Sequence, residues 1–345
     1  MPQSSPPPRR PRILQVVSHL ALGGAERVAV TLMECLRDEF DFSLHAVRGV
    51  EAGGIGDALA REIHALNVPL TLGARVPMRF GGVITSGIGL TRVVRRLQPD
   101  LIHLHTEIPE AACAAMLAWS PALREIPLVR TIHNTVFWHF WRPLGRWCDR
   151  RIAHSFIAGV SPACVETVLQ LRRESGAAAP PETPLTIYNG MRVPPPARRR
   201  ENGGDGPVKL IFGGRLEPQK GTDLLPEILA RTRPPTRGAH LLIFGSGTHG
   251  GLLRSLAGNP PRGWRVELRA PTPRFIEEIS QCDLMILPSR YEGLGLVAVE
   301  AALAGTPVVA TNAAGLRDVF SHDHPWLAQP GDAADFAAKL QHALD

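Results

Sequence analysis

The segment DLMILPSRYEGLGLVAVEAALAGTPVVAT, residues 283–311, contains two short apolar runs, separated by a glycine-containing turn and an alanine- and valine-rich stretch. An apolar run, a helical pattern and a second apolar run predict a strand, a helix and a strand in that order. Strands that are apolar along their whole length are typical of a parallel sheet with helices on both faces. The segment therefore predicts an α/β fold.

The same alternation continues through the rest of the chain. In the second half, further strands are predicted at 208–216, 240–247 and 264–271, with helices at 221–233, 249–257 and 275–282. In the first half, strands are predicted at 12–20, 41–49, 69–72, 99–106, 127–134 and 155–161, with helical patterns such as 24–39 and 89–98 between them. This pattern predicts two Rossmann-like, doubly wound parallel-sheet domains.

Residues 191–207, MRVPPPARRRENGGDGP, separate the two halves. Prolines, an arginine run and glycines continue neither a helix nor a strand, so this segment is predicted to be a linker. Residues 1–11 are proline-rich and charged and are predicted to be a disordered lead-in. The predicted domains are therefore 12–190 and 208–345, facing a cleft where ligands bind at the carboxyl ends of the strands.

The composition limits the class of protein. Of the 345 residues, 44% are hydrophobic, which is ordinary for a globular protein. No apolar run of about 18 residues predicts a transmembrane helix, and the N-terminal residues lack the apolar stretch of a secretory signal. The five cysteines show no metal or CxxC spacing. We therefore expect a protein of the reducing cytoplasm.

The charge is unevenly distributed between the two halves. Residues 1–200 contain 24 Arg, no Lys and 16 acidic residues, whereas the remainder contains 14 basic and 16 acidic residues. A basic first half would suit an anionic lipid, an anionic acceptor or nucleic acid. The alternative is an arginine-rich solvated surface. Nucleic acid is the least favoured partner, because no nucleic-acid-binding motif accompanies the basic residues.

Two carboxylates stand out in the opening segment. Glu292 is predicted to lie at the strand-to-helix turn, and Glu300 follows eight residues later, roughly 12 Å along a helix that starts near Gly293. Gly293 and Gly295 let backbone N–H groups approach a ligand, and a helix start favours an anion. An extended nucleotide sugar fits this spacing. The alternative is a helix-terminal acid stabilised by the helix dipole and a solvated glutamate.

A second motif is GGRLEPQKG, residues 213–221, which follows a predicted strand. Gly213 and Gly214 are succeeded within a few residues by Arg215 and Lys220. Two cations beside bare glycines in a loop suit a diphosphate. Two solvated cations in a turn are the alternative.

The first half offers weaker signals. GGAER, residues 23–27, resembles a phosphate-type glycine turn but does not match GxGxxG, so a turn without a ligand remains open. His105 and His133 each end a predicted strand, and His103 lies inside one. Each is typical of a satisfied structural histidine as well as of a site residue. Their spacing matches no zinc pattern.

Residues 137–151, FWHFWRPLGRWCDRR, combine aromatic and basic side chains. This composition suits a helix at a membrane interface. A core helix with a basic rim is the alternative. The residues predicted to face an acceptor or a membrane are Trp138, Trp141, Arg142 and Arg146.

Taken together and in this order, the motifs resemble the retaining glycosyltransferases of the GT-B fold, in particular glycosyltransferase family 4, also called group 1. Glu292 and Glu300 match the E-x7-E pattern of that family, and residues 213–221 match its Arg/Lys diphosphate motif. SHLALGGAER (18–27), GVS (159–161) and IYNG (187–190) match further segments. The matches extend over roughly residues 12–318.

The resemblance implies roles for these residues. His133, Arg215, Lys220 and Glu292 would be catalytic, with His133 near the reacting sugar and the two cations at the diphosphate. Glu300 would bind the ribose. The remaining donor-binding residues would be Gly23, Gly24, Gly214, Gly293, Leu294, Gly295 and Leu296.

The resemblance also implies an activity. It implies a metal-independent hexosyltransferase without a cofactor, whose substrate is a nucleotide-diphosphate sugar, with a UDP-sugar favoured. Residues 12–190 would bind a glycan or lipid-linked acceptor, and residues 208–345 would bind the donor. The expected process is cell-surface polysaccharide or glycolipid synthesis, with possible peripheral contact to the anionic inner face of the cytoplasmic membrane.

Two other functions remain open from the sequence. A GT-B sugar epimerase shares the fold, but lacks the E-x7-E pattern combined with the Arg/Lys pair. A non-catalytic nucleotide-sugar-binding scaffold is the other. The family usually continues with a helix that crosses back to the first domain, whereas this sequence stops after one predicted helix at 332–345, so we expect that crossover to be short or missing.

Overall fold

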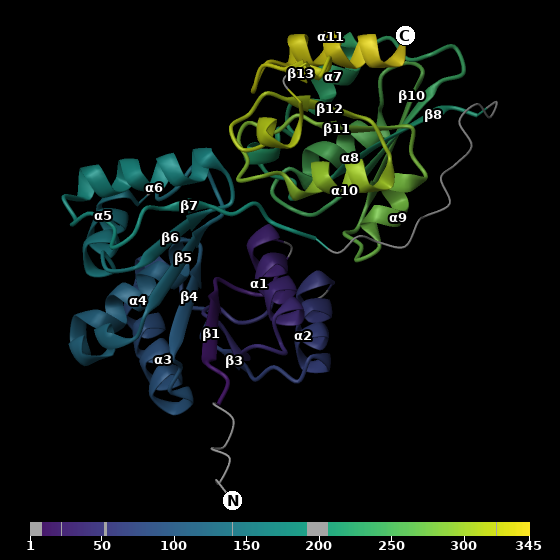
Figure 1. The fold of residues 1–345 in the computed structure, drawn as a ribbon. Helices are drawn as coiled ribbons and strands as arrows, with labels where there is room; N and C mark the ends of the chain where they lie inside the picture. Colours follow the sequence, from purple (N-terminus) through teal and green to yellow (C-terminus); the bar gives the residue numbers. More distant parts are fainter. Residues whose placement is uncertain (1–8, 22, 52–53, 140, 192–205, 322) are drawn as a thin grey trace, which may run out of the picture. The chain divides into compact units, whose positions relative to one another are not determined.

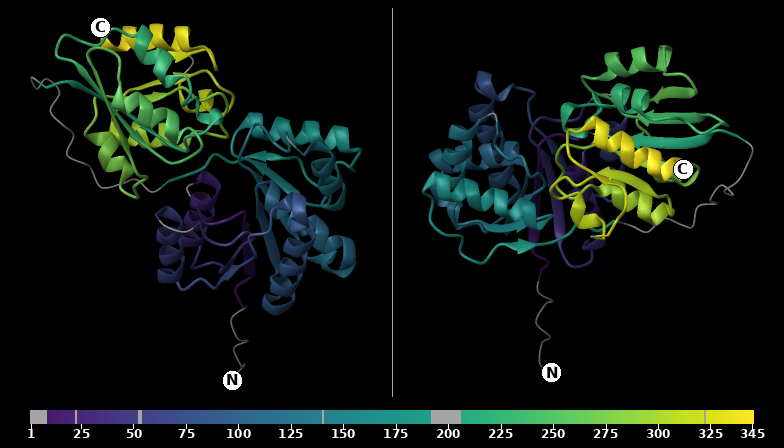
Figure 2. Two further views of the ribbon diagram at one scale, coloured as in Figure 1. Left: turned by 180° about the vertical axis from the view of Figure 1, so that it is seen from behind. Right: turned by 90° about the horizontal axis from the view of Figure 1, so that it is seen from above.

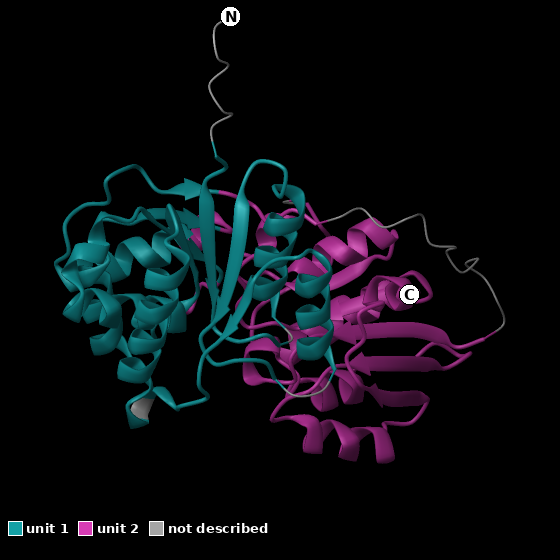
Figure 3. Ribbon diagram, turned by 90° about the horizontal axis from the view of Figure 1, so that it is seen from below, with its two compact units in different colours: residues 1–133, 137–159, 165–186 teal, residues 134–136, 160–164, 187–345 magenta. Residues whose placement is uncertain are grey.

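A computed structural model describes residues 9–21, 23–51, 54–139, 141–191, 206–321 and 323–345. The chain divides into two compact units, shown in different colours in Figure 3. The first unit comprises residues 1–133, 137–159 and 165–186. The second comprises residues 134–136, 160–164 and 187–345.

The described residues of the first unit form a seven-stranded sheet in the order β3-β2-β1-β4-β5-β6-β7, with every pair parallel. The strands are β1 (Arg12–Val17), β2 (Asp41–Ala46), β3 (Leu70–Leu72), β4 (Leu101–His105), β5 (Leu128–Ile132), β6 (Phe156–Gly159) and β7 (Leu185–Thr186). The chain reverses its direction of travel across the sheet at β1, which lies between β2 and β4.

Helices cover both faces of this sheet (Figures 1 and 2). They are α1 (Gly24–Cys35), α2 (Ile55–Ala65), α3 (Gly82–Leu97), α4 (Glu107–Trp119), α5 (Arg142–Arg151) and α6 (Pro162–Ser175), with short 3₁₀ turns η1 (Met78–Phe80) and η2 (Pro121–Glu125). The side chains Val17, Leu44 and Met33 form a core between the sheet, α1 and α2. Figure 1 shows α3 and α4 on the other side.

The described residues of the second unit form a six-stranded sheet in the order β10-β9-β8-β11-β12-β13, also wholly parallel. Its strands are β8 (Val208–Gly213), β9 (Ala239–Phe244), β10 (Trp264–Arg269), β11 (Leu284–Leu287), β12 (Val308–Thr311) and β13 (Leu327–Ala328). Its helices are η3 (Pro218–Lys220), α7 (Leu225–Arg231), α8 (Gly250–Gly258), α9 (Phe275–Ser280), α10 (Leu296–Ala304), η4 (Arg317–Val319) and α11 (Ala333–Leu344).

Alternation along β8 explains the two cores of this unit. Leu210 and Phe212 enter a cluster with residues of α7, α8 and α11, whereas Ile211 enters a cluster with α9 and α10. Successive side chains of a strand point to opposite faces, so an all-apolar strand is buried on both sides. Figure 1 shows α7 and α11 above this sheet and α9 and α10 below it. The prediction of two doubly wound parallel sheets is confirmed.

Two predictions differ from the structure, and a third falls largely outside the described residues. Arg9 was assigned to a disordered lead-in, but its guanidinium lies 2.7 and 2.8 Å from the two carboxylate oxygens of Asp100, which places it on the first unit. The predicted helix near Gly293 begins instead at Leu296. Most of the predicted linker, residues 192–205, lies outside the described residues.

Candidate functional site

The loop after β8 is shaped by glycines that no other residue can replace without displacing a neighbour. A Cβ at Gly213 would lie 2.0 Å from the ring of Phe275. Gly221 has φ +65, and a Cβ there would lie 1.9 Å from the carbonyl oxygen of Pro288. That approach seats the end of η3, which carries Lys220, against the end of β11. Both predicted motifs of the second unit thus meet at the carboxyl edge of its sheet.

Lys220 and Glu292 form the central pair of this edge. The Nζ atom of Lys220 lies 2.6 Å from Oε1 of Glu292, and the side chains are 14% and 9% exposed. Ser289 donates its hydroxyl to the same carboxylate oxygen at 2.7 Å. Thr311 in turn donates to the Ser289 carbonyl, which ties the pair to β12. Neither Ser289 nor Thr311 was predicted, because a buried serine carries no signal in a single sequence.

The pair keeps unused hydrogen-bonding capacity. Among the described residues, Glu292 accepts side-chain hydrogen bonds at Oε1 and none at Oε2, and Lys220 uses one of its three N–H donors. Mutual pairing lowers the free energy of holding two charges in a largely buried place. A ligand that offers hydroxyl groups to Oε2 and oxygen acceptors to Nζ can therefore bind without breaking the pair.

Arg215 lies on the exposed side of the same loop. It donates to Oε1 of Gln219 at 2.7 Å, and Gln219 donates to the backbone carbonyl of Tyr291 at 3.2 Å. These bonds link the cation to the loop that carries Glu292. Arg290, which was not predicted, forms a bidentate pair with Asp223 at 2.7 and 2.8 Å. The hydrogen bonds from Arg290 hold the pKa of Asp223 below its usual value despite partial burial.

The turn before α10 differs from the prediction in one respect. Gly295 is the residue before the helix, with φ +77, and a Cβ there would lie 2.5 Å from the Leu316 side chain. Leu294 is buried, and Glu300 is half-buried at the fifth residue of α10. Glu292 therefore lies in the turn and only Glu300 lies on the helix. The N–H groups of the first helical turn begin at Leu296.

In the first unit, the predicted glycine turn lies directly before α1. Gly23 is the residue preceding the helix, and Gly24 is its first residue. A Cβ at Gly23 would lie 2.1 Å from a carboxylate oxygen of Glu26, which is itself buried. A side chain at position 23 would therefore require the carboxylate of Glu26 to move.

The histidines of the first unit form a hydrogen-bonded chain with Gln15. Nε2 of His105 lies 2.7 Å from Oε1 of Gln15, and Nδ1 of His105 lies 2.9 Å from Nε2 of His133. His103 lies beside them, with Nε2 2.7 Å from the hydroxyl of Thr131 and its ring centroid 4.1 Å from that of His105. Gln15 lies on β1, His103 and His105 lie on β4, and His133 directly follows β5.

The hydrogen bonds from Gln15 through His105 determine which ring nitrogen of His133 carries the proton. Because the Gln15 oxygen can only accept, His105 carries its proton on Nε2, and its Nδ1 accepts the Nε2 proton of His133. Nδ1 of His133 is then an acceptor. Burial lowers the pKa of His133 to about 3 and of His103 to about 4, and burial with two histidine neighbours holds the pKa of His105 well below its usual value. All three rings are neutral at pH 7.

These lowered pKa values predict acid sensitivity. The unfolded chain takes up protons near pH 6.5, whereas folded His103 and His133 stay neutral to about pH 4 and 3. The free energy of unfolding should therefore fall as the pH drops from about 6.5 towards 4, by up to about 1.4 kcal/mol per pH unit for each histidine. Urea unfolding across this range measures the slope. His103→Gln should reduce it, and an unchanged slope in that variant would contradict the assignment.

Comparison with known proteins identifies the family to which this chain belongs. Residues 22–192 match the family model described as Glycosyltransferase Family 4, and residues 207–345 match Glycosyl transferases group 1. Over 291 residues the chain is 30% identical to a D-inositol 3-phosphate glycosyltransferase of Pseudarthrobacter chlorophenolicus, covering 76% of this chain and 68% of that protein. The chain belongs to the group 1 glycosyltransferases.

Other members and structures extend the comparison. This group 1 glycosyltransferase is 30% identical to a glycogen synthase of Mycobacterium tuberculosis over 76% of its own length and 65% of the relative's length. It resembles the Anabaena HepE structure in complex with UDP and glucose, with a TM-score of 0.76, 21% identity and coverage of 97% and 90% of the two chains. Sucrose-phosphate synthase from Thermosynechococcus elongatus has a TM-score of 0.71 and 17% identity, with coverage of 97% and 90%. The predicted GT-B fold is confirmed.

The aromatic and basic segment 137–151 of this group 1 glycosyltransferase needs a correction. Trp138 is 6% exposed, and its indole N–H donates to Oε2 of Glu110 at 3.1 Å, so it lies inside the first unit and not on an acceptor or membrane face. The helix α5 begins only at Arg142. An indole whose N–H finds a buried carboxylate packs inward like any core aromatic side chain.

The other three residues of that predicted face are accessible to different degrees. Trp141 is 43% exposed and Arg146 is half-buried. Arg142 is bound to Glu174 through two hydrogen bonds of 2.7 and 2.8 Å. Its charge is therefore already compensated. The structure leaves Trp141 as the exposed aromatic side chain among the four predicted residues.

Trp138 borders a buried ionic cluster, which consists of Glu110, Arg130, Asp149, Arg172 and Ser175. Arg130 on β5 lies 2.8 Å from Glu110 and 2.8 Å from Asp149, and all three side chains are at most 1% exposed. Arg172 lies 3.1 Å from Asp149, and Ser175 donates to Asp149 at 2.8 Å. The cluster joins β5 to α4, α5 and α6.

The described residues contain neither a metal-binding cluster nor a membrane-spanning helix. Within them, no group of three or more His, Cys, Asp or Glu side chains is arranged to hold a metal ion. Within the same residues, no helix is both long and apolar enough to pass through a bilayer.

Proposed function

We propose that this chain transfers a hexose from a nucleotide-diphosphate sugar to a glycan or lipid-linked acceptor, with retention of anomeric configuration. The observation that carries the proposal is the Lys220–Glu292 pair at the carboxyl edge of the second sheet, with unused hydrogen-bonding capacity on both partners. Such edges are where open α/β sheets bind ligands. Family membership supports the same reaction class.

The donor would lie along this edge. Arg215 and Lys220 would neutralise the diphosphate, and the N–H groups at the start of α10 would add further donors. Oε2 of Glu292 would accept sugar hydroxyl protons, and Glu300 would hold the ribose. Two cations supply electrostatic stabilisation of the leaving diphosphate, which supports a reaction without a metal ion. A UDP-sugar is the favoured donor, since the similar HepE structures contain UDP or UDP-glucose.

The reaction would proceed on one face of the sugar. The acceptor oxygen bonds to the anomeric carbon while the bond from that carbon to the phosphate oxygen breaks. The acceptor proton passes to the leaving diphosphate, so a separate general base is unnecessary. The resemblance to the family would bring His133 near the sugar; because its ring is neutral and its Nδ1 can accept a hydrogen bond, its role would be a positioning contact with a sugar hydroxyl rather than proton transfer.

The biological setting is part of the proposal. Cell-surface polysaccharide or glycolipid synthesis in the cytoplasm would supply a glycan or lipid-linked acceptor. A relative 26% identical over 262 residues is described as a putative teichuronic acid biosynthesis glycosyltransferase of Bacillus subtilis, which supports that setting. Contact with the inner face of the membrane would follow for a lipid-linked acceptor.

Nucleotide release tests the proposal. The purified protein should release a nucleoside diphosphate from one nucleotide sugar in a panel of UDP, ADP and GDP sugars, in the presence of EDTA. Slow hydrolysis of the donor suffices as a readout before the acceptor is known. Donor binding without any release, with candidate glycans and lipid-linked acceptors present, would instead indicate a scaffold. Release that requires added divalent metal would contradict the metal-independent reaction.

A further inference from the structure

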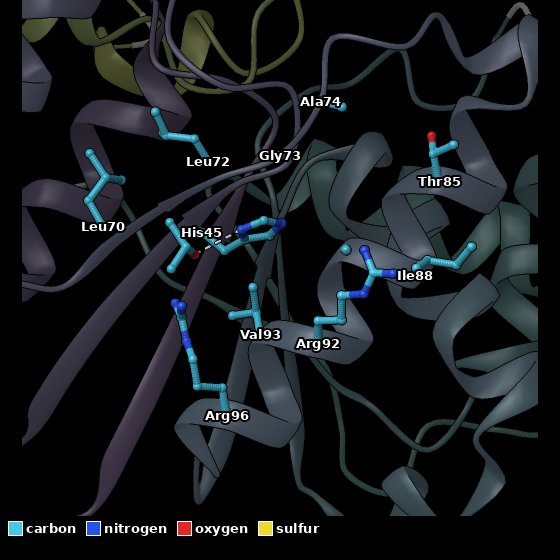
Figure 4. Close-up of a pocket in the computed structure, with 12 residues that line it drawn as sticks. His45, Leu70, Leu72, Gly73, Ala74, Thr85, Ile88, Arg92, Val93 and Arg96 are labelled. Carbon is cyan, nitrogen blue, oxygen red and sulfur yellow. Dashed lines mark hydrogen bonds between the residues drawn. The ribbon is translucent and has the colours of Figure 1, made fainter.

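A cavity of about 720 Å³ opens in the first unit between the edge of the sheet and α3 (Figure 4). Its walls come from the end of β2, from β3 and the residues after it, and from α3. None of its lining residues belongs to the donor edge or to the histidine chain. It exists because β3 is an edge strand and α3 packs on α4, so that α3 does not cover the outer part of the sheet.

His45 forms the floor of the cavity and is 2% exposed. Its Nδ1 lies 2.9 Å from the hydroxyl of Thr71, and that hydroxyl donates to the Leu44 carbonyl at 3.3 Å. Thr71 must therefore accept the Nδ1 proton of His45, which leaves Nε2 as an acceptor. Nε2 is buried and has no hydrogen-bond partner among the described residues. Burial lowers the pKa of His45 to about 4, so the ring is neutral at pH 7.

Two arginines on α3 line the same cavity. Arg92 and Arg96 are exposed, and within the described part of the chain neither forms a salt bridge with a carboxylate. Figure 4 shows their guanidinium groups on either side of the His45 ring in that view. Residues four apart on a helix are neighbours, and like charges at that spacing repel. Among the described residues that line the cavity, none is acidic. An anion there would compensate both charges.

We propose that this cavity binds a phosphate ester that carries a free hydroxyl group. The phosphate lies between Arg92 and Arg96, because guanidinium groups form paired, charge-assisted hydrogen bonds with phosphate oxygens. The hydroxyl donates to Nε2 of His45, the buried acceptor that the protein leaves unpaired. Exposed Leu72 and Ile88 accommodate carbon atoms of the ester at the wall. The site is separate from the donor edge and does not depend on the proposed transfer reaction.

Glycerol phosphate is a small group with this chemistry, and it has two sources. It occurs as soluble glycerol 3-phosphate and as the headgroup of phosphatidylglycerol. Calorimetry with glycerol 3-phosphate tests the first source, with UDP present to occupy the donor edge. Co-sedimentation with phosphatidylcholine vesicles, with and without phosphatidylglycerol, tests the second. Binding in either arm supports the site and identifies its source.

The chain offers matched variants for this test. Gly89 lines the cavity on α3, and a Cβ there meets no atom within 4 Å, so Gly89→Leu should occupy part of the cavity beside the arginines without disturbing the fold. Gly251→Leu in α8 is the control, because it places the same side chain at an equally open helical glycine. Arg92→Ala is compared with Arg95→Ala, which removes the same charge from the same helix outside the cavity.

The expected results separate the site from general charge. Gly89→Leu should abolish detectable binding, and Arg92→Ala should weaken it by about tenfold or more, the effect of losing a charge-assisted hydrogen bond. Gly251→Leu and Arg95→Ala should stay within about twofold of the unmodified protein, as should Lys220→Ala at the donor edge. Equal weakening by Arg95→Ala and Arg92→Ala, or no binding in either arm, would overturn the proposal. Loss with Lys220→Ala would assign the binding to the donor edge instead and would equally overturn it.

Discussion

Replacing Glu292 by Gln should lower kcat/KM for the release of nucleoside diphosphate by about a hundredfold or more. The amide keeps the shape of the side chain but removes the charge that pairs with Lys220 and that, in the proposed function, accepts hydrogen bonds from sugar hydroxyls. Lost electrostatic stabilisation of a transition state in a largely buried site has effects of this size. Initial rates under saturating and limiting donor measure the effect. Glu227→Gln, in an exposed ion pair with Arg231, is the control and should change the rate less than twofold.

Because Lys220 and Glu292 also stabilise each other, the stability of the variant must be measured together with its activity. Glu292→Gln leaves the ammonium of Lys220 largely buried beside a neutral amide, which we expect to lower the free energy of unfolding by about 1–3 kcal/mol. In the double variant Lys220→Met/Glu292→Gln no unpaired charge remains, so stability should recover relative to the single variant while activity does not. Activity that recovers together with stability would show that the pair is structural and not catalytic.

The second large effect is expected at Asp149 in the buried ionic cluster. Asp149→Ala leaves Arg130 and Arg172 without their shared carboxylate, and breaking a buried pair in this way lowers the free energy of unfolding by about 3–5 kcal/mol. That is a large part of the total stability of a typical domain, about 5–15 kcal/mol. Urea unfolding of the purified protein measures it. Glu174→Ala removes the partner of Arg142 on the surface and should cost at most about 1 kcal/mol.

The pH dependence of the same cluster gives an independent check. Burial opposes ionisation of Asp149, but Arg130 and Arg172 outweigh it and keep its pKa below the usual value. A carboxyl with a lowered folded pKa contributes stability above its unfolded pKa and loses that contribution as the pH falls further. Asp149→Asn should therefore flatten the acid limb of the stability curve below about pH 4. A variant as stable as the unmodified protein would show that the cluster contributes little.

Much of the fold could be predicted because its signals are local. Apolar strands such as LMIL at residues 284–287 and their spacing from helical patterns identify parallel α/β architecture without knowledge of contacts. Gly214 and Lys220 were predicted for the donor site for the same reason, since a glycine turn after a strand is visible in sequence. The start of α10 was misplaced, because the glycines at 293 and 295 fit either a turn or a first helical turn.

The rest depended on partners that lie far away in the chain. Trp138 was read as interfacial because its neighbours are basic, but its position is decided by Glu110, which lies 28 residues earlier. Ser289 and Thr311, which hold Glu292 in place, look like ordinary residues at strand ends. The bidentate pair of Arg290 with Asp223 spans 67 residues. Composition and spacing cannot indicate such tertiary contacts.

Strand β5 also bears on how the chain avoids misassembly. Its successive residues Arg130 and Thr131 serve opposite faces, one inside the ionic cluster and the other bonded to His103. A slip of one residue against β4 or β6 would exchange the two faces of β5. The guanidinium of Arg130 would then be buried among groups that cannot neutralise its charge. A wholly apolar strand such as β11 would tolerate the same slip more readily. Arg130 thus specifies the register of β5, because a misaligned strand would bury an unpaired charge. Folding intermediates with β5 in the wrong register should therefore be short-lived.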